Sequence, residues 1–165
     1  IDSKSGHLQL IKAMPKIIKK FSKIKLMFVG GESLTNKISK ERAEYENEVH
    51  STIKSLGLEE HVIFTGSVDY EKLPLYYNSA DIVALTSKNE GFGLAVTEGM
   101  ACGKPVIGTN VPGIALQVKD GVNGFLVGIG DFDKTAQRIL ELLKNKKLSH
   151  MKRTQEELIR RILNC

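Results

Sequence analysis

Six apolar residues near the start of the chain recur at helical spacing, and lysines fill the positions between them: Leu8, Ile11, Met14, Ile17, Ile18 and Phe21. An apolar stripe of this kind is typical of an amphipathic helix that packs on a sheet. We therefore expect a helix from about Gly6 to Phe21. Pro15 lies inside the pattern and removes one helical hydrogen bond, which predicts a kink or a division into two shorter helices.

Short apolar runs alternate with helical segments along the rest of the chain. The runs predict buried strands at residues 25–29, 62–65, 82–85, 106–108 and 125–127. The other segments predict helices at residues 40–56, 72–79, 94–102 and 131–143, and a last charged, amphipathic stretch covers residues 148–163. This alternation predicts an α/β fold, with a Rossmann-like, mostly parallel sheet and helices on both of its faces.

Ligands of such sheets bind beyond the carboxyl ends of the strands, so the loops that follow the strands are the candidate site. The loop after residues 82–85 is rich in glycine. Gly91 and Gly93 allow the backbone to approach a ligand closely, and a helix is expected to begin directly after them. Because the first N–H groups of a helix attract anions, a pyrophosphate can rest near Gly93, Leu94 and Ala95.

Two glutamates flank this loop and the first turn of the helix. Glu98 lies about one turn into the predicted helix, where it can accept hydrogen bonds from the paired hydroxyls of a ligand. Glu90 lies on the loop and can reach another part of the ligand. A purely structural role is the alternative interpretation. A Gly-x-Gly loop is common, and the helix dipole alone favours a glutamate in the first helical turn. A Rossmann dinucleotide signature is disfavoured, because Val96 stands where the third small residue should be.

The composition narrows the class of protein. A chain of 165 residues fits one domain, and no apolar run approaches the length that crosses a bilayer. The first residues lack a signal-peptide pattern and an initiator Met, which suggests an excised piece of a longer chain. Cys102 and Cys165 form no disulfide or zinc pattern, and the four histidines lack ligand spacing. We therefore predict no metal site, and a reducing cytoplasm fits best.

The net charge of +5 favours an acidic or phosphorylated partner. Aromatic residues are not interleaved with the lysines, and no nucleic-acid-binding signature is present, so no nucleic-acid partner is expected. Contact with an anionic membrane is an alternative for one lysine cluster, but a solvated helix face is the preferred interpretation. That cluster consists of Lys12, Lys16, Lys19 and Lys20.

The combined motifs resemble one known family. Residues 89–94 read NEGFGL and residues 98–107 read EGMACGKPVI, which places two glutamates eight positions apart. Residues 28–31, 62–66, 76–81 and 121–127 surround them in the order found in that family. The chain resembles, over nearly its whole length, the C-terminal, donor-binding domain of retaining GT-B glycosyltransferases, often labelled group 1.

The resemblance implies roles for individual residues. Glu98 would bind the ribose hydroxyls of a nucleotide, the backbone from Phe92 to Ala95 would face its diphosphate, and Glu90 would contact the transferred sugar. Val68 resembles the position that lines the base. Gly30 resembles a glycine that lets the nucleotide approach the end of a strand.

The sequence departs from the family pattern at its start. The family's domain opens with a central strand, an Arg and then a Lys-Gly pair, whose two cations hold the phosphates. This chain begins after the Arg position, and Ser5 precedes Gly6 where the Lys belongs. Lys4 is an alternative phosphate ligand, although a solvated loop lysine is the preferred interpretation. The sheet is then expected to lack its first strand.

The resemblance implies that residues 1–165 form one nucleotide-sugar-binding domain of a larger two-domain enzyme. That enzyme would transfer a sugar from a nucleotide-diphosphate sugar to a glycan or lipid acceptor, with retention, in cytoplasmic polysaccharide biosynthesis. No metal or other cofactor is expected. The chain alone would bind without catalysis, because the N-terminal acceptor domain is absent. A non-catalytic nucleotide-sugar-binding module is the main alternative, and an epimerase or a phosphorylase is a third.

Overall fold

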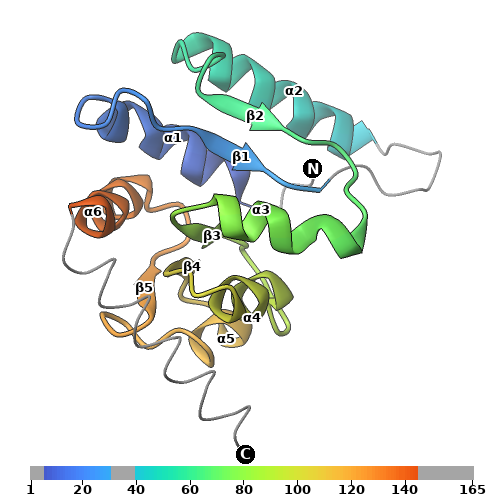
Figure 1. Ribbon diagram of the computed structural model, residues 1–165. Coiled ribbons are helices and arrows are strands. Elements are labelled where there is room, and N and C mark those ends of the chain that lie inside the picture. The colour runs from blue at the N-terminus through green and yellow to red at the C-terminus, as the bar shows by residue number, and fades with distance from the viewer. Residues whose placement is uncertain (1–5, 31–39, 145–165) are drawn as a thin grey trace, which may run out of the picture.

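The computed structural model describes residues 6–30 and 40–144, and it contains five short strands within a set of helices (Figure 1). In chain order the elements are α1 (His7–Ile18), β1 (Leu26–Phe28), α2 (Lys40–Ser55), β2 (Val62–Phe64), a short 3-10 helix (Tyr70–Lys72), α3 (Leu73–Ser79), β3 (Val83–Leu85), α4 (Leu94–Ala101), β4 (Val106–Thr109), α5 (Pro112–Ala115), β5 (Gly124–Val127) and α6 (Phe132–Leu143).

The strands form two parallel sheets, which confirms the predicted α/β class. Strand β1 pairs with β2, and β4 lies between β3 and β5 in the second sheet. The predicted strands and helices within the described residues are present, with ends that differ by a few residues. The four-residue helix α5 was not predicted, and the stretch at 148–163 lies outside the described residues.

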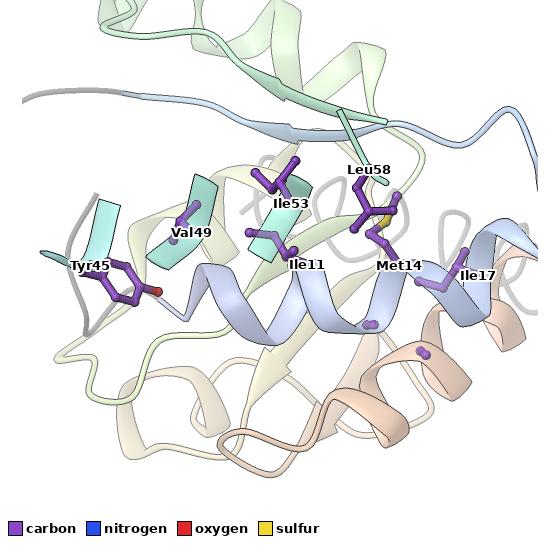
Figure 2. Packing of buried hydrophobic residues seen from close by; sticks show 9 residues of the cluster. Ile11, Met14, Ile17, Tyr45, Val49, Ile53 and Leu58 are labelled. Atoms are coloured by element: carbon purple, nitrogen blue, oxygen red, sulfur yellow. The ribbon is translucent and has the colours of Figure 1, made fainter. Parts of the chain in front are cut away.

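The division of α1 at Pro15 is a wrong prediction, because α1 is one helix with Pro15 inside it. Proline removes one helical hydrogen bond, but packing on both sides of this position stabilises the continuous helix. Ile11, Met14 and Ile17 are almost fully buried. In Figure 2 these three side chains of α1 lie beneath Val49, Ile53 and Leu58, which follow each other along α2 and the turn after it. Burial of this apolar face holds α1 in place.

The facing edges of the two sheets do not pair with each other. A pocket of about 610 Å³ is lined by residues of β1 and β3, together with parts of α1, α2, α3 and α4. The expectation that the sheet lacks its first strand stays a prediction. One end of this pocket reaches the carboxyl ends of β1 and β3, where the candidate site was predicted.

Helix α1 contacts both halves of the structure. Its apolar residues belong to the core over β1 and β2, and its other side packs against α6. The buried amide of Gln9 donates to the carbonyl of Gly128 and to the hydroxyl of Thr135, each at 2.9 Å. It also accepts from the N–H of Gly130 at 2.7 Å. These bonds fix α1 to the loop that follows β5 and to α6.

Within the described residues, none of the helices is long and apolar enough to cross a membrane.

Candidate functional site

The candidate site lies where β1, β2 and β3 end. Gly30 follows β1, lines the pocket and forms an isolated bridge with Gly66, which follows β2. The N–H of Gly30 donates to the hydroxyl of Thr65 at 3.3 Å. Val68 is partly buried close by in sequence, but it is not among the residues that line the pocket. The structure therefore places Gly30, but not Val68, at the pocket wall.

The beginning of α1 lies against the end of β3. Gly6 is the N-cap of α1, and its carbonyl accepts from the hydroxyl of Thr86 at 2.9 Å. A Cβ atom on Gly6 would lie 1.8 Å from the carbonyl oxygen of Thr86, and Gly6 has a φ of 68°. Only glycine fits both conditions without rearrangement. The predicted phosphate ligand Lys4 and its neighbour Ser5 lie outside the described residues.

The glycine loop between β3 and α4 is hydrogen-bonded to α5. The N–H of Gly113 donates to the carbonyl of Glu90 at 3.2 Å. A Cβ atom on Gly113 would lie 2.3 Å from that carbonyl oxygen, so the absence of a side chain permits this contact. The side chain of Glu90 is half-buried and lies beside Gly93, because its Cγ would be 3.3 Å from a Cβ on that residue.

Helix α4 begins directly after this loop, as predicted. Gly93 is its N-cap, with a φ of 76°, and the carbonyl of Gly93 accepts from Val96 at 2.8 Å. The first N–H groups of a helix have no acceptor within the helix, and they lie at its positive end. Ala95 lines the pocket, while the side chains of Phe92 and Leu94 are 53% and 66% exposed. The backbone at the start of α4 can therefore bind an anion.

The side chain of Glu98 is held by a tyrosine that the sequence did not identify as a site residue. The hydroxyl of Tyr77, on α3, donates to Oε2 of Glu98 at 2.7 Å, and Tyr77 also lines the pocket. Within residues 6–30 and 40–144, no hydrogen-bond partner lies at Oε1 of Glu98. Burial, and then the hydrogen bond to the Glu98 carboxylate, raise the pKa of Tyr77 well above its ordinary value of about 10. Tyr77 therefore stays protonated and remains a donor.

Replacing Tyr77 with phenylalanine is expected to lower the free energy of unfolding by about 1 kcal/mol, because a hydrogen bond to a carboxylate is lost. The raised pKa adds a pH dependence. Above about pH 10 the unfolded chain ionises this tyrosine while the folded chain does not, so its stabilising contribution falls as pH rises. Urea unfolding at pH 8 and pH 11 measures this. A difference between wild type and Tyr77→Phe that does not shrink at pH 11 would contradict it.

Metal ligands do not gather at this site. Across residues 6–30 and 40–144, no group of three or more histidine, cysteine, aspartate or glutamate side chains is arranged to hold an ion.

Comparisons with known proteins identify the family of the chain. A family model described as "Glycosyl transferases group 1" matches residues 1–158. N-acetyl-alpha-D-glucosaminyl L-malate synthase of Bacillus anthracis is 38% identical over 96 residues, which are 58% of this chain and 25% of that protein. The chain spans about a quarter to a third of the length of the first curated relatives that it matches.

Solved structures share the fold. Anabaena Alr3699/HepE in complex with UDP-glucose superimposes with a TM-score of 0.83 at 28% identity, over 96% of this chain and 41% of that one. The C-terminal domain of a glycosyl transferase group 1 family protein (LpcC) from Francisella tularensis gives a TM-score of 0.82 at 26% identity, over 96% and 80% of the two chains.

Proposed function

The chain belongs to the glycosyl transferase group 1 family, and we propose that it is the donor-binding domain of an enzyme that transfers a sugar from a nucleoside-diphosphate sugar. One observation carries this proposal. The start of α4 lies at the carboxyl end of β3, beside the pocket, and Tyr77 holds the Glu98 carboxylate one turn into the same helix. An anion site and a hydroxyl acceptor on one helix suit a diphosphate joined to a ribose.

We assign the site residues by the chemistry of their positions. The backbone N–H groups of Gly93, Leu94 and Ala95 bind the diphosphate, and Oε1 of Glu98 accepts from the ribose hydroxyls. Glu90, on the loop in front of α4, contacts the sugar. When the bond between the sugar and the diphosphate breaks, negative charge grows on the leaving phosphate. Fixed N–H groups at the helix start stabilise that charge, which lowers the barrier.

Three further residues complete the proposed site. Gly30 leaves room for the nucleotide at the end of β1, which fits its place in the pocket wall. Val68 would line the base, as the family resemblance implies. Lys4 is proposed as a phosphate ligand on its charge alone. Uridine is the proposed base, because Alr3699/HepE has been solved with UDP and with UDP-glucose.

The chain is proposed to be one of two domains. It covers 80% of a solved C-terminal domain, but only about a quarter to a third of the first curated relatives. The reaction would then occur in a cleft between this domain and an N-terminal domain that binds the acceptor. Transfer with retention, a glycan or lipid acceptor, and independence of a metal or other cofactor belong to the same proposal.

We also propose that the enzyme works in the cytoplasm. A weaker proposal is that the lysine cluster at the beginning of the chain, Lys12, Lys16, Lys19 and Lys20, contacts a membrane peripherally. Lys16 already pairs with Asp133 of α6 at 2.7 Å, so this basic face is partly neutralised.

Binding of nucleoside diphosphates to the full-length protein tests the proposal. Calorimetry with UDP, GDP and ADP should find UDP the tightest ligand, and UDP should bind at least about tenfold more tightly than uridine because the helix start binds the diphosphate. Failure to bind any of the three would contradict the proposed function. Incubation with UDP-glucose then separates the alternatives. Release or transfer of glucose supports an enzyme, and binding without either would favour a non-catalytic module.

A further inference from the structure

Gln117, one turn beyond the start of α5, connects three segments around the glycine loop. Its amide nitrogen donates to the carbonyl of Phe92, on the loop, and to the carbonyl of Gly113 at 3.0 Å. Its amide oxygen accepts from the hydroxyl of Thr97, on α4, at 2.5 Å. Loop, α4 and α5 are therefore joined by one side chain.

The chemistry of these bonds requires an amide. A primary amide has two N–H donors and one acceptor oxygen, and all of these functions are engaged in Gln117. A glutamate of the same length has no N–H to donate, and it would place a negative charge beside two carbonyl oxygens. A hydrophobic side chain would leave the loop carbonyl without this partner.

The bond to Phe92 fixes more than one carbonyl. A trans peptide is planar, and its C=O and N–H groups point to opposite sides. When Gln117 holds the carbonyl of Phe92, the N–H of Gly93 in the same peptide must point away from Gln117. Gly93 has no side chain to restrict it, and it has a φ of 76°, so this peptide would otherwise rotate more freely.

We propose that Gln117 is a positioning residue for the diphosphate-binding loop. It holds the peptide between Phe92 and Gly93 so that the N–H of Gly93 faces the diphosphate, while Gly113 fixes the same loop at Glu90. This inference rests on the proposed function. It assigns to α5, which the sequence did not predict, and to the turn after it, the role of holding the backbone of the anion site in place.

Replacing Gln117 with glutamate or methionine in the full-length protein tests the inference. Both variants are expected to bind UDP about tenfold more weakly and to bind uridine within about twofold of the wild-type affinity, because only UDP needs the loop N–H groups. Thermal unfolding checks that each variant is folded. Gln137→Glu on α6 is the matched control, because it makes the same change of charge on an exposed glutamine and should leave both affinities unchanged.

Thr97 gives a second route that does not alter Gln117. Thr97 is exposed, so Thr97→Val should fold, and it removes the hydroxyl that orients the Gln117 amide. UDP affinity is expected to fall about two- to threefold, and Thr97→Ser, which keeps the hydroxyl, should restore it. The effects of Thr97→Val and Gln117→Met should not add, because both act on one contact.

The outcomes distinguish a failure of the proposed function from a failure of the inference about Gln117. Failure of the wild-type protein to bind UDP would contradict the proposed function, and the inference would fall with it. Normal UDP binding by wild type and by folded Gln117 variants would overturn the inference alone. Equal losses for UDP and uridine would also overturn it, because they would mean that Gln117 only stabilises the domain.

Discussion

Replacing Glu90 with glutamine in the full-length protein is expected to lower kcat about 100-fold or more while UDP affinity stays nearly unchanged. Glu90 lies on the loop before α4, where the proposed arrangement places the sugar rather than the ribose. The amide has the size of the carboxylate but no charge. Charge near the sugar matters most when positive character develops at the carbon that leaves the diphosphate, so the loss should appear in the transition state.

The structure makes this substitution a clean test. The Glu90 backbone carbonyl is held by Gly113 whatever the side chain is, so the loop should keep its shape. Steady-state kinetics with UDP-glucose give kcat, and calorimetry with UDP gives the affinity. Glu59→Gln, at an exposed position after α2, is the control for the same loss of charge. Parallel losses of rate and affinity would mean that Glu90 fixes the conformation of the glycine loop. An unchanged rate would leave it outside the reaction.

Replacing Glu98 with alanine is expected to weaken UDP binding by about 1.5–3 kcal/mol, or about 10- to 150-fold. The carboxylate would otherwise accept charge-assisted hydrogen bonds from two ribose hydroxyls. The substitution also deprives Tyr77 of its acceptor. Glu98→Gln separates the two effects, because the amide oxygen can still accept from Tyr77 while the negative charge is lost.

A change in the ligand sharpens the Glu98 experiment. The 2′-deoxy form of UDP lacks one of the two hydroxyls, so its affinity should fall less than that of UDP when Glu98 is replaced by alanine. Calorimetry with both ligands, on wild type and on both variants, completes the comparison. Equal losses for UDP and 2′-deoxy-UDP would contradict ribose recognition. Unchanged affinities would reduce Glu98 to a residue that stabilises the beginning of α4.

The sequence predicted the regular elements well because their patterns are local. Apolar runs such as residues 62–65 and 106–108, and the amphipathic stripe of α1, depend on neighbours within a few positions. The division predicted at Pro15 was wrong because local chemistry favours a break, whereas the burial of Ile11 and Ile17 is a tertiary effect. Helix α5 was missed because four residues starting at Pro112 carry no periodic signal.

The sequence could predict only those parts of the candidate site that lie within one contiguous segment. The loop and the start of α4 are contiguous, so glycine spacing and the place of Glu98 revealed them. The contact from Tyr77 crosses 21 positions and joins two helices, and no spacing rule predicts it. Gln117 contacts Phe92 across 25 positions for the same reason. Long-range pairing depends on how α3, α4 and α5 pack, which only the fold reveals.

The packing of α1 against α2 on one side and α6 on the other has a consequence for how the domain unfolds. No backbone hydrogen bond joins the sheets to each other within the described residues, whereas α1 fills the core above one and fixes the β5–α6 loop of the other through Gln9. Detachment of α1 would expose the core over β1 and β2 and, in the same event, the face of α6 that packs against it. The domain should therefore behave as one cooperative folding unit, in which amide hydrogens of β1 and β4 become exchangeable together.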